Sequence, residues 1–462
     1  MKHVLRHAPF ITALALLTTP LGAQATGEDD GFASPIEGRL QSIARNAPQR
    51  AIADMVEEIC PNGIGRGVIS NQDLQDRCTD VVQAALVTGD EDGALAAMQA
   101  LAAEEVNAIG TSEVDASAGQ MDAIGARLQN LRAGGPRVAF AMPGFDGALA
   151  AEGGAGLLSG GGASADMASR LGVFVSGNYA FNARDATANE AGFDADTYGV
   201  TAGVDYQLSD PLLVGAAFTY ASTDADISLR GGTLETDSYG GFAYATYLIG
   251  GGWFVDLMGG YTQNEHGQVR NIAYTVRGLT RGVVALDQRA LSDLESDEIA
   301  GSFKFGFDAA HGAWTVSPYV RVDVAEVSID GYTERMSRPS AIGNGVALQI
   351  DDQSFTSIMS AIGARFGYLS AYGWGTWYPQ LVAEYVHEFD NEGDPVTGRY
   401  VDAPTASFAM GIDDPDQNFA NVGVSSSFIF NNGNAAFVSF QTLLGYTDLT
   451  THAVEIGVRL PF

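Results

Sequence analysis

Residues 198–208 read YGVTAGVDYQL, and their side chains alternate between two chemical characters. The apolar set takes every second position: Tyr198, Val200, Ala202, Val204, Tyr206 and Leu208. Glycine and polar residues fill the positions between them. Because successive side chains of a strand point to opposite faces, this period of two predicts a β-strand with one apolar and one polar, glycine-rich face.

The same alternation continues to the end of the chain and predicts about twelve antiparallel strands. They lie near 170–181, 196–208, 212–226, 235–249, 252–264, 298–309, 313–328, 355–369, 374–390, 419–430, 434–446 and 451–462. Short turns such as Ser209-Asp210-Pro211 alternate with long polar connections at 265–297, 329–354 and 391–418. An even strand number with this alternation is typical of a bacterial outer-membrane barrel, and a soluble sandwich gives no reason for it.

Membrane insertion by this chain requires a closed barrel. No stretch after residue 25 resembles an apolar helix span, and in lipid every backbone group must be paired. Aromatic residues such as Trp253, Trp314 and Trp377 fall near strand ends, as interfacial girdles require. We therefore expect an all-β transmembrane barrel whose outer face contacts outer-membrane lipid and lipopolysaccharide.

The first residues predict export. Lys2 and Arg6 precede an apolar run at 8–21, and Ala23-Gln24-Ala25 offers the small residues that signal peptidase needs. We expect cleavage after Ala25, with residues 1–25 as signal peptide. A retained membrane anchor is disfavoured, since the run is shorter than the roughly 20 residues that span a bilayer.

Residues 26–133 predict a small helical domain. Apolar residues recur there at spacings close to 3.6, first at Leu40, Ile43, Ala47, Ile52, Met55, Val56 and Ile59, and later at Met121, Ile124, Leu128 and Leu131. Pro48 limits the first helix, and Ser70 and Asp90 are candidate caps for later ones. Residues 134–169 are rich in glycine and alanine and predict a flexible linker or a segment that lies in the barrel lumen.

Cys60 and Cys78 are the two cysteines of the chain and bracket a loop of 17 residues. In an exported protein this pattern favours a disulfide, and closing such a loop stabilises by roughly 3 kcal/mol. Two free buried thiols remain the alternative. A metal site is disfavoured, because no histidine or third cysteine lies nearby.

Charge and motifs exclude several functions. With 24 basic and 56 acidic residues, the chain lacks the basic surface that nucleic acid requires. It has no GxSxG, HExxH, SxxK or P-loop motif, so we expect no enzyme, cofactor or metal site. His387 is the best lone catalytic candidate, but in the strand alternation its side chain points to the same face as the lipid-facing residues. The same holds for His452.

Acidic clusters are interpreted as structural. Residues 89–93 read GDEDG, which favours helix capping over a calcium loop. Acidic loop positions are interpreted as solvated rather than as weak cation sites: Asp351, Asp352, Asp413, Asp414 and Asp416.

Residues 451–462 read THAVEIGVRLPF and form the most specific stretch. Its alternate apolar positions are Val454, Ile456, Val458, Leu460 and Phe462. A terminal amphipathic strand that ends in phenylalanine looks like the signal read by the barrel-assembly machinery. Together with LGVFVSGNYAF from residue 171 and SPYVRVDVAEVSIDGYTE at 317–334, residues 170–462 resemble the translocator β-domain of autotransporters, the type V secretion family.

This resemblance implies a twelve-stranded barrel, a segment before the first strand that crosses the lumen, and an N-terminal passenger displayed or released outside. Residues 26–133 depart from the family pattern, because passengers are commonly long repetitive β-helices and this region is short, helical and free of repeats. What the passenger does is left open by the sequence.

Three functions follow from these observations. We expect an outer-membrane autotransporter that displays its short helical region at the cell surface. The alternative is an outer-membrane channel or envelope anchor whose helical domain is periplasmic or plugs the lumen. A surface enzyme or adhesin is motivated only by what other autotransporters carry, and no surface or host partner can be named.

Overall fold

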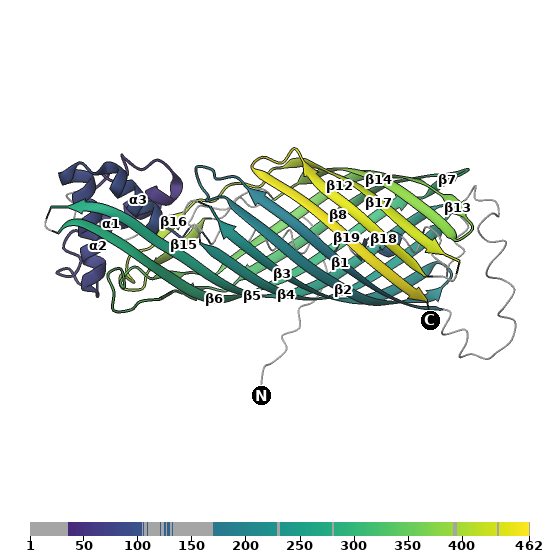
Figure 1. Cartoon of the computed structure of the whole chain (residues 1–462), viewed down its shortest axis with the longest axis horizontal. Helices are drawn as coiled ribbons and strands as arrows, with labels where there is room; N and C mark the ends of the chain where they lie inside the picture. The colour runs from purple at the N-terminus through teal and green to yellow at the C-terminus, as the bar shows by residue number, and fades with distance from the viewer. Residues whose placement is uncertain are drawn as a thin grey trace, which may run out of the picture.

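The computed structural model describes residues 36–103, residues 105, 109, 121, 124–125, 127–129 and 132, and residues 170–461 apart from 229–231, 280, 391–394 and 432–433. A long barrel of tilted strands fills most of the molecule, and a group of helices lies at one of its ends (Figure 1). Across these described ranges, no helix is both long and apolar enough to span a membrane.

Twelve of the described strands form the barrel. They are β1 (Leu171–Arg184), β2 (Phe193–Ser209), β3 (Leu212–Ile227), β4 (Thr233–Gly250), β5 (Trp253–Gly278), β6 (Gly282–Phe307), β8 (Trp314–Ile329), β12 (Gln353–Tyr368), β14 (Gly375–Glu388), β17 (Asn418–Phe430), β18 (Ala435–Leu444) and β19 (Leu449–Pro461). Each strand pairs antiparallel with the next, and β19 returns to pair with β1 from Gly172↔Pro461 to Arg184↔Leu449. The ring is therefore closed, and the predicted strand number is confirmed.

The two faces of the strands follow the predicted parity. On β2, Tyr198 is 58% exposed and Val200 is 50% exposed on the outside of the barrel. Thr201 and Asp205 point inward and are buried. The apolar face therefore meets lipid and the polar face lines the lumen, as expected for a transmembrane barrel.

The two ends of the barrel differ in the length of their connections. At the turn end, short connections join β2 to β3, β4 to β5 and β17 to β18, and the short strands β7 (Ala309–His311) and β13 (Ser370–Tyr372) flank the other turns. At the loop end, long connections at 330–352 and 389–417 follow β8 and β14. The predicted loop at 265–297 was wrong, because β5 and β6 pair continuously from Trp253↔Phe307 to Gly278↔Gly282.

The long connections at the loop end contain strands of their own. β9 (Tyr332–Thr333), β11 (Leu348–Ile350), β15 (Val396–Tyr400) and β16 (Phe408–Met410) form a separate antiparallel sheet. β10 (Arg335–Met336) pairs instead with the extended part of β6. This sheet and the projecting β5–β6 ribbon lie together beyond the barrel wall (Figure 1).

The N-terminal helices are α1 (Ala47–Ile59), α2 (Gln72–Gln83), the π-helical turn η1 (Ala84–Thr88) and α3 (Glu91–Leu101). Asn46 caps α1 by accepting from the backbone N–H of Gln49, and Pro48 lies in the first turn, where its missing N–H is tolerated. Leu40 precedes this helix, in a turn. The predicted cap Ser70 was wrong, because Asn71 accepts from the backbone N–H of Asp73.

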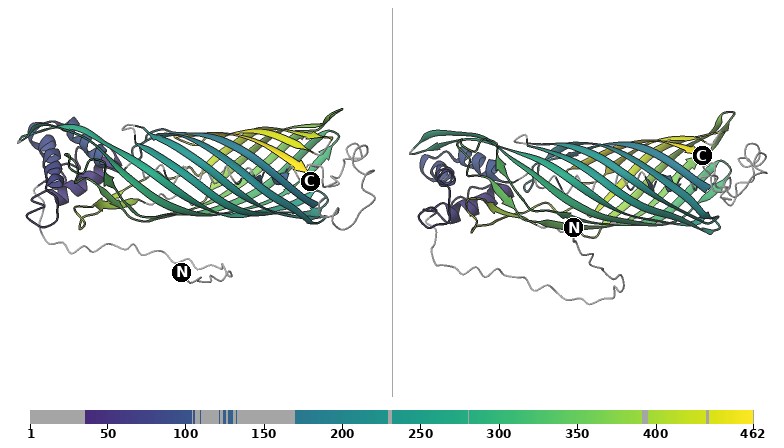
Figure 2. Two further views of the ribbon diagram at one scale, coloured as in Figure 1. Left: turned by 60° about the horizontal axis from the view of Figure 1, so that its bottom comes forward. Right: turned by 90° about the horizontal axis from the view of Figure 1, so that it is seen from below.

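We call residues 36–103 the helical cap. All three views place it at the loop end, against the β5–β6 ribbon and the small sheet (Figures 1 and 2). Its apolar side chains belong to the same buried cluster as those of the ribbon and the small sheet. The cap and the loop end of the barrel therefore share one hydrophobic core.

Candidate functional site in the lumen and at the mouth of the barrel

The inner wall of the barrel is rich in hydroxyl and carboxylate groups, because these side chains occupy the inward positions of the strands. The hydroxyl oxygens of Thr197 on β2 and Thr223 on β3 lie 2.8 Å apart. Asp205 on β2 and Asp256 on β5 are inward carboxylates nearer the turn end. Such a wall can hold a positively charged segment inside the barrel.

Arg127 lies inside the barrel and pairs with Asp205. Its Nε donates to Asp205 Oδ2 at 2.9 Å, and its Nη2 donates to the same oxygen. The guanidinium carbon lies 5.3 Å from the centre of the Phe174 ring on β1. Because a buried charge is costly unless it is paired, this ion pair fixes residue 127 against the wall.

Arg132 makes a second buried ion pair closer to the turn end. Its Nη1 donates to both carboxylate oxygens of Asp256, at 2.6 and 2.5 Å. Its Nε lies 3.4 Å from a carboxylate oxygen of Asp308, and its guanidinium lies 3.7 Å from the centre of the Phe254 ring. One cation thus bridges two carboxylates that both lie at the turn end of the β5–β6 pair, near the start of β5 and just after the end of β6.

Ile124 and Leu128 insert into an apolar socket of the wall and are fully buried. The socket consists of Phe174, Leu213, Ala217, Phe242 and Tyr244. Glycine makes room for these rings: a Cβ atom at Gly215 would lie 2.2 Å from the Tyr244 ring. The described residues at 121–132 are therefore held in the lumen by both apolar and ionic contacts.

The lumen also contains a cavity of about 580 Å³ that both polar and apolar side chains line. Glu384 of β14 accepts hydrogen bonds from Tyr319 at 2.5 Å and from Arg321 at 3.0 Å. Lys304 lines the cavity with its ammonium 4.8 Å from the Tyr319 ring centre. It is the only lysine after Lys2, so amine-reactive reagents can report on access to the lumen.

At the mouth of the barrel, Arg270 on the extended part of β5 joins three segments. It donates from Nε and Nη2 to the two oxygens of Glu334, at 2.8 and 2.6 Å. It also donates to the carbonyl oxygens of Ala100 in α3, at 3.2 Å, and of Val346, at 3.1 Å. Burial alone would lower the pKa of Arg270, but the Glu334 carboxylate raises it above its ordinary value, so this arginine stays charged.

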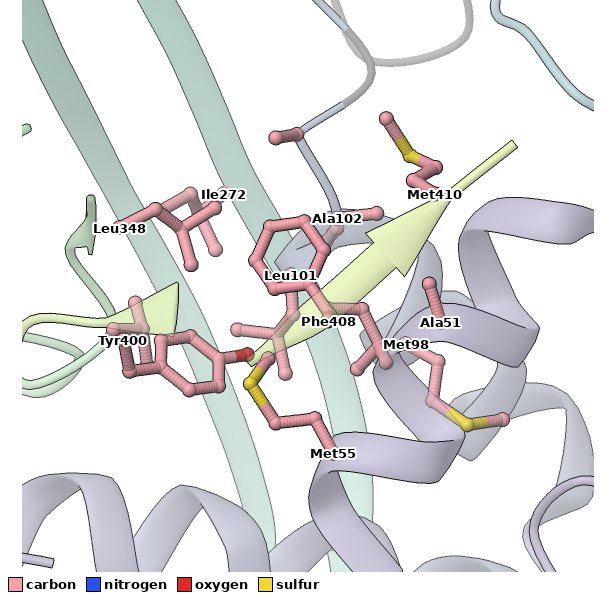
Figure 3. Packing of buried hydrophobic residues seen from close by; sticks show 14 of the residues in the cluster. Ala51, Met55, Met98, Leu101, Ala102, Ile272, Leu348, Tyr400, Phe408 and Met410 are labelled. Carbon is pink, nitrogen blue, oxygen red and sulfur yellow. The ribbon is translucent and has the colours of Figure 1, made fainter. Parts of the chain in front are cut away.

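Apolar side chains of the helical cap and of the barrel connections pack together at the mouth (Figure 3). Met55 and Met98 come from helices of the cap, and Ile272, Leu348 and Phe408 come from β5, β11 and β16. All five side chains are buried. The mouth of the barrel is thus closed by a core to which the cap and the barrel connections both contribute.

Comparison with known proteins decides the family. A protein-family model described as the autotransporter β-domain matches residues 173–441, more than half of the chain. The chain belongs to this family. The predicted autotransporter family and the predicted outer-membrane β-barrel are therefore confirmed.

Individual relatives of this autotransporter are distant. Esterase EstA of Pseudomonas aeruginosa is 27% identical over 219 residues, which cover 46% of this chain and 30% of EstA. A protein described as an uncharacterised protein in the trpE-trpG intergenic region of Pseudomonas putida is 24% identical over 217 residues, covering 47% of this chain and 34% of that protein. The autotransporter thus spans about a third of the length of these relatives, and the esterase name describes EstA.

Among solved structures, the translocator domain of autotransporter NalP from Neisseria meningitidis has a TM-score of 0.51. It covers 76% of this chain and 99% of its own, at 12% identity. At this identity the likeness shows the fold alone.

Cys60 and Cys78 form a disulfide in the cap, as predicted. Cys60 follows the last residue of α1, and Cys78 lies in the middle of α2. The bond therefore ties the first two helices together across the connection between them.

The predicted targeting residues stay predictions. Ala23 and Ala25 lie outside the described residues, as do Phe462 and the side chain of Leu460. Val454, Ile456 and Val458 project from the outer face of β19 and are exposed. The linker predicted at 134–169 also lies outside the described residues, so the predicted domain boundaries are not tested.

The lone histidines lie on the outer face of the barrel, as their parity predicts. His387 Nδ1 is 2.9 Å from the side-chain oxygen of Asn418, and its ring packs edge-on against Phe389. His452 Nδ1 is 2.9 Å from the hydroxyl of Thr442. These hydrogen bonds suit side chains at a membrane interface.

The acidic clusters have protein partners. Asp90 stands at the N-cap of α3, but its side chain accepts from the backbone N–H of Arg277 instead of capping the helix. Asp351 pairs with Arg399 at 3.1 Å, and Asp413 accepts from Asn189 at 2.6 Å. Within the described ranges, no group of three or more potential metal ligands is present.

Arg127 and Arg132 were missed as functional residues by sequence reasoning, although the helical spacing around them was noted. The available signal was two arginines in a strongly acidic chain, just before the glycine-rich segment. Inward aspartates on strands that otherwise present small residues would have been their natural partners.

Proposed function

We propose that this autotransporter displays the helical cap on the cell surface and keeps the described residues between 121 and 132 in the lumen as a fixed plug. The observation that carries the proposal is the path of the chain. The cap lies at the loop end, Arg127 and Arg132 are bound inside the barrel, and β1 begins at the turn end. Bacterial barrels place long connections outside the cell and short turns in the periplasm.

The energetics of the lumen contacts favour permanent occupation. Two arginines and two large apolar side chains of this segment are buried against the wall. Removing the segment would leave Asp205 and Asp256 as buried carboxylates without their cations, which is strongly unfavourable. The lumen-plugging part of the alternative function is thus compatible with display, and the two differ in which side of the membrane holds the cap.

Epitope tags at three positions test the proposal. The first is inserted after Gly67 in the cap, the second after Leu279 at the tip of the β5–β6 ribbon, and the third after Gly373 at the turn end. Antibodies should label the first two tags on intact cells and the third only after permeabilisation. Labelling of the cap tag only in permeabilised cells, with the ribbon tag labelled on intact cells, would contradict display.

We also propose that the cap has no catalytic activity of its own. Support comes from the missing nucleophile and metal motifs and from the structural partners of its acidic residues. Hydrolysis of nitrophenyl esters should be equal for cells that express the full chain and for cells that express residues 105–462 behind the same signal peptide. Activity lost with the cap would overturn this proposal.

A further inference from the structure

We propose that the mouth of the barrel is a docking surface that retains the helical cap after the chain between them has been cut. We call this surface the mouth platform: residues 270–294 of β5 and β6, with the connections 330–352 and 396–412. The inference goes beyond display, because it concerns retention and holds whichever side of the membrane the mouth faces.

The mouth platform presents an apolar surface where the barrel wall presents a polar one. Ile272, Tyr274 and Val276 occupy the inward positions of extended β5 and are buried. Val284 and Leu286 do the same on β6. Because the ribbon projects past the end of β4 at Thr233↔Val269, these side chains face the cap instead of the lumen.

Both partners would expose core residues if they separated. Ile52, Met55 and Met98 of the cap are at most 1% exposed, and so are Ile272 and Leu348 of the mouth platform. The labelled side chains from the two parts interdigitate around Phe408 (Figure 3). Burial of such residues is the main favourable contribution to association.

Polar groups of the two parts are also matched. A carboxylate oxygen of Asp73 in α2 accepts backbone N–H groups from Gly343 at 2.9 Å and Gly345 at 3.1 Å. A Cβ atom at Gly345 would lie 2.7 Å from the backbone nitrogen of Leu74, so glycine permits this close approach. The helix and the connection therefore fit each other at backbone level.

Two further points of attachment lie far apart on the mouth platform. Asp402 accepts from the side chain of Asn71 at 2.7 Å, and its carbonyl accepts from the backbone N–H of Ser70 at 2.9 Å. At the ribbon tip, the side chain of Gln83 accepts from the backbone N–H of Leu279 at 2.8 Å. The cap is thus bound along its length and cannot pivot about a single contact.

None of these contacts depends on the chain between the cap and the lumen. Arg270 and Ala100 are 170 residues apart in sequence, and Asn71 and Asp402 are 331 apart. A cut between Gly110 and Thr111 leaves every one of them in place. Retention therefore rests on the interface alone.

The experiment inserts a recognition site for a specific protease between Gly110 and Thr111. The full chain is purified in detergent, cut completely and passed over a size-exclusion column with the disulfide intact. The fragment that contains the cap should elute with the barrel. Separation of the fragment from the otherwise unchanged barrel would overturn the proposal.

A matched pair of variants tests whether the mouth platform retains the cut helical cap. Leu348→Asp places a charge in the shared core, whereas Ile342→Asp changes a side chain that is 55% exposed on the same connection. The retained fraction should fall by at least about tenfold in Leu348→Asp and stay unchanged in Ile342→Asp.

Migration of the unheated protein in detergent gels verifies that each barrel is folded. If Leu348→Asp prevents assembly, the double variant Arg270→Ala/Glu334→Gln takes its place, because it removes the bond to Ala100 without leaving the Glu334 carboxylate unpaired in the core. Equal retention by a folded core variant and by Ile342→Asp would contradict the proposal.

Discussion

The two halves of β5 carry the same alternation with opposite polarity. From Trp253 to Tyr261 the exposed outward residues are large and apolar, and the inward ones include Asp256. From Arg270 to Gly278 the inward residues include the apolar Ile272, Tyr274 and Val276 beside the paired Arg270, while the outward ones include Thr275 and Arg277. β6 makes the same change, from outward Phe303 to inward Leu286.

The surroundings explain this inversion. In the membrane half, lipid is outside and a polar lumen inside, so apolar residues face outward. In the mouth half, water is outside and the helical cap inside, so apolar residues face inward. The outer face of this one strand pair therefore contacts lipid in the membrane half and water in the mouth half. The position at which the polarity inverts marks where the membrane part ends.

The largest effect is expected from a charge placed on the apolar side of each half. Ile272→Asp should destabilise the cap by about 5 kcal/mol or more, because it adds an unpaired carboxylate to the shared core. Leu257→Asp, on the lipid side, should cost roughly 2 kcal/mol and affect barrel assembly instead. Limited proteolysis reports on the cap, and migration of the unheated protein reports on the barrel. If the cap of Ile272→Asp resists limited proteolysis as well as the cap of the original protein does, the proposed inversion of polarity along β5 is contradicted.

The next effect concerns the polar inner face of the membrane half. Arg132→Ala leaves Asp256 and Asp308 without their shared cation, and breaking a buried pair typically costs about 3–5 kcal/mol. We expect the lumen segment to loosen, single-channel conductance to rise, and Lys304 to react faster with amine reagents. Adding Asp256→Asn and Asp308→Asn should reverse part of the change. A conductance equal to that of the original protein would show that Arg132 does not hold the plug.

A smaller effect is expected at the apolar socket. Gly215→Ala puts a methyl group against the Tyr244 ring, and such overpacking costs about 1–3 kcal/mol. Gly241→Ala is the matched control, because a Cβ atom there would have nothing within 4 Å. Thermal unfolding followed by circular dichroism should separate the two variants, and equal midpoints would argue against the socket.

The smallest effect concerns the rim of the mouth platform and depends on pH. Burial opposes the charge on Asp76, but hydrogen bonds from Arg281 and Gln72 lower its pKa below the ordinary value of 3.8. Its contribution is therefore present above about pH 4 and lost as the pH falls through the lowered pKa. The ion pair between Asp76 and Arg281 lies near the surface, so it should contribute less than about 1 kcal/mol to the stability of the cap. Between pH 5 and 3, cap stability should fall less in Asp76→Asn than in the original protein, and identical pH profiles would exclude this role.

Sequence reasoning predicted the barrel well, because parity repeats on every strand. It placed all twelve strands and the disulfide partners Cys60 and Cys78. It ended β5 near residue 264, since we followed the outward apolar side and that side becomes polar there. The alternation of Ile272, Tyr274 and Val276 on the other parity was the available signal.

The candidate site was harder to predict, because its parts are distant in sequence. Arg127 meets Asp205, and Arg270 meets Ala100 and Glu334, only after the ring has closed. A single sequence shows which residues of each strand point inward. It does not show the register between strands, which decides which inward residues lie side by side in the lumen. It also gives no sign that two loop connections complete the core of an N-terminal domain.

The sequence by itself determined the closed barrel, its lipid-facing side and the asymmetry of its ends, because these follow from local alternation and from the cost of unpaired backbone in lipid. Only the tertiary structure decided that the helical cap and the barrel connections form one core, and that two arginines are bound inside the lumen. These features depend on contacts between segments up to 332 residues apart, such as Ser70 and Asp402, and no local pattern specifies such pairs.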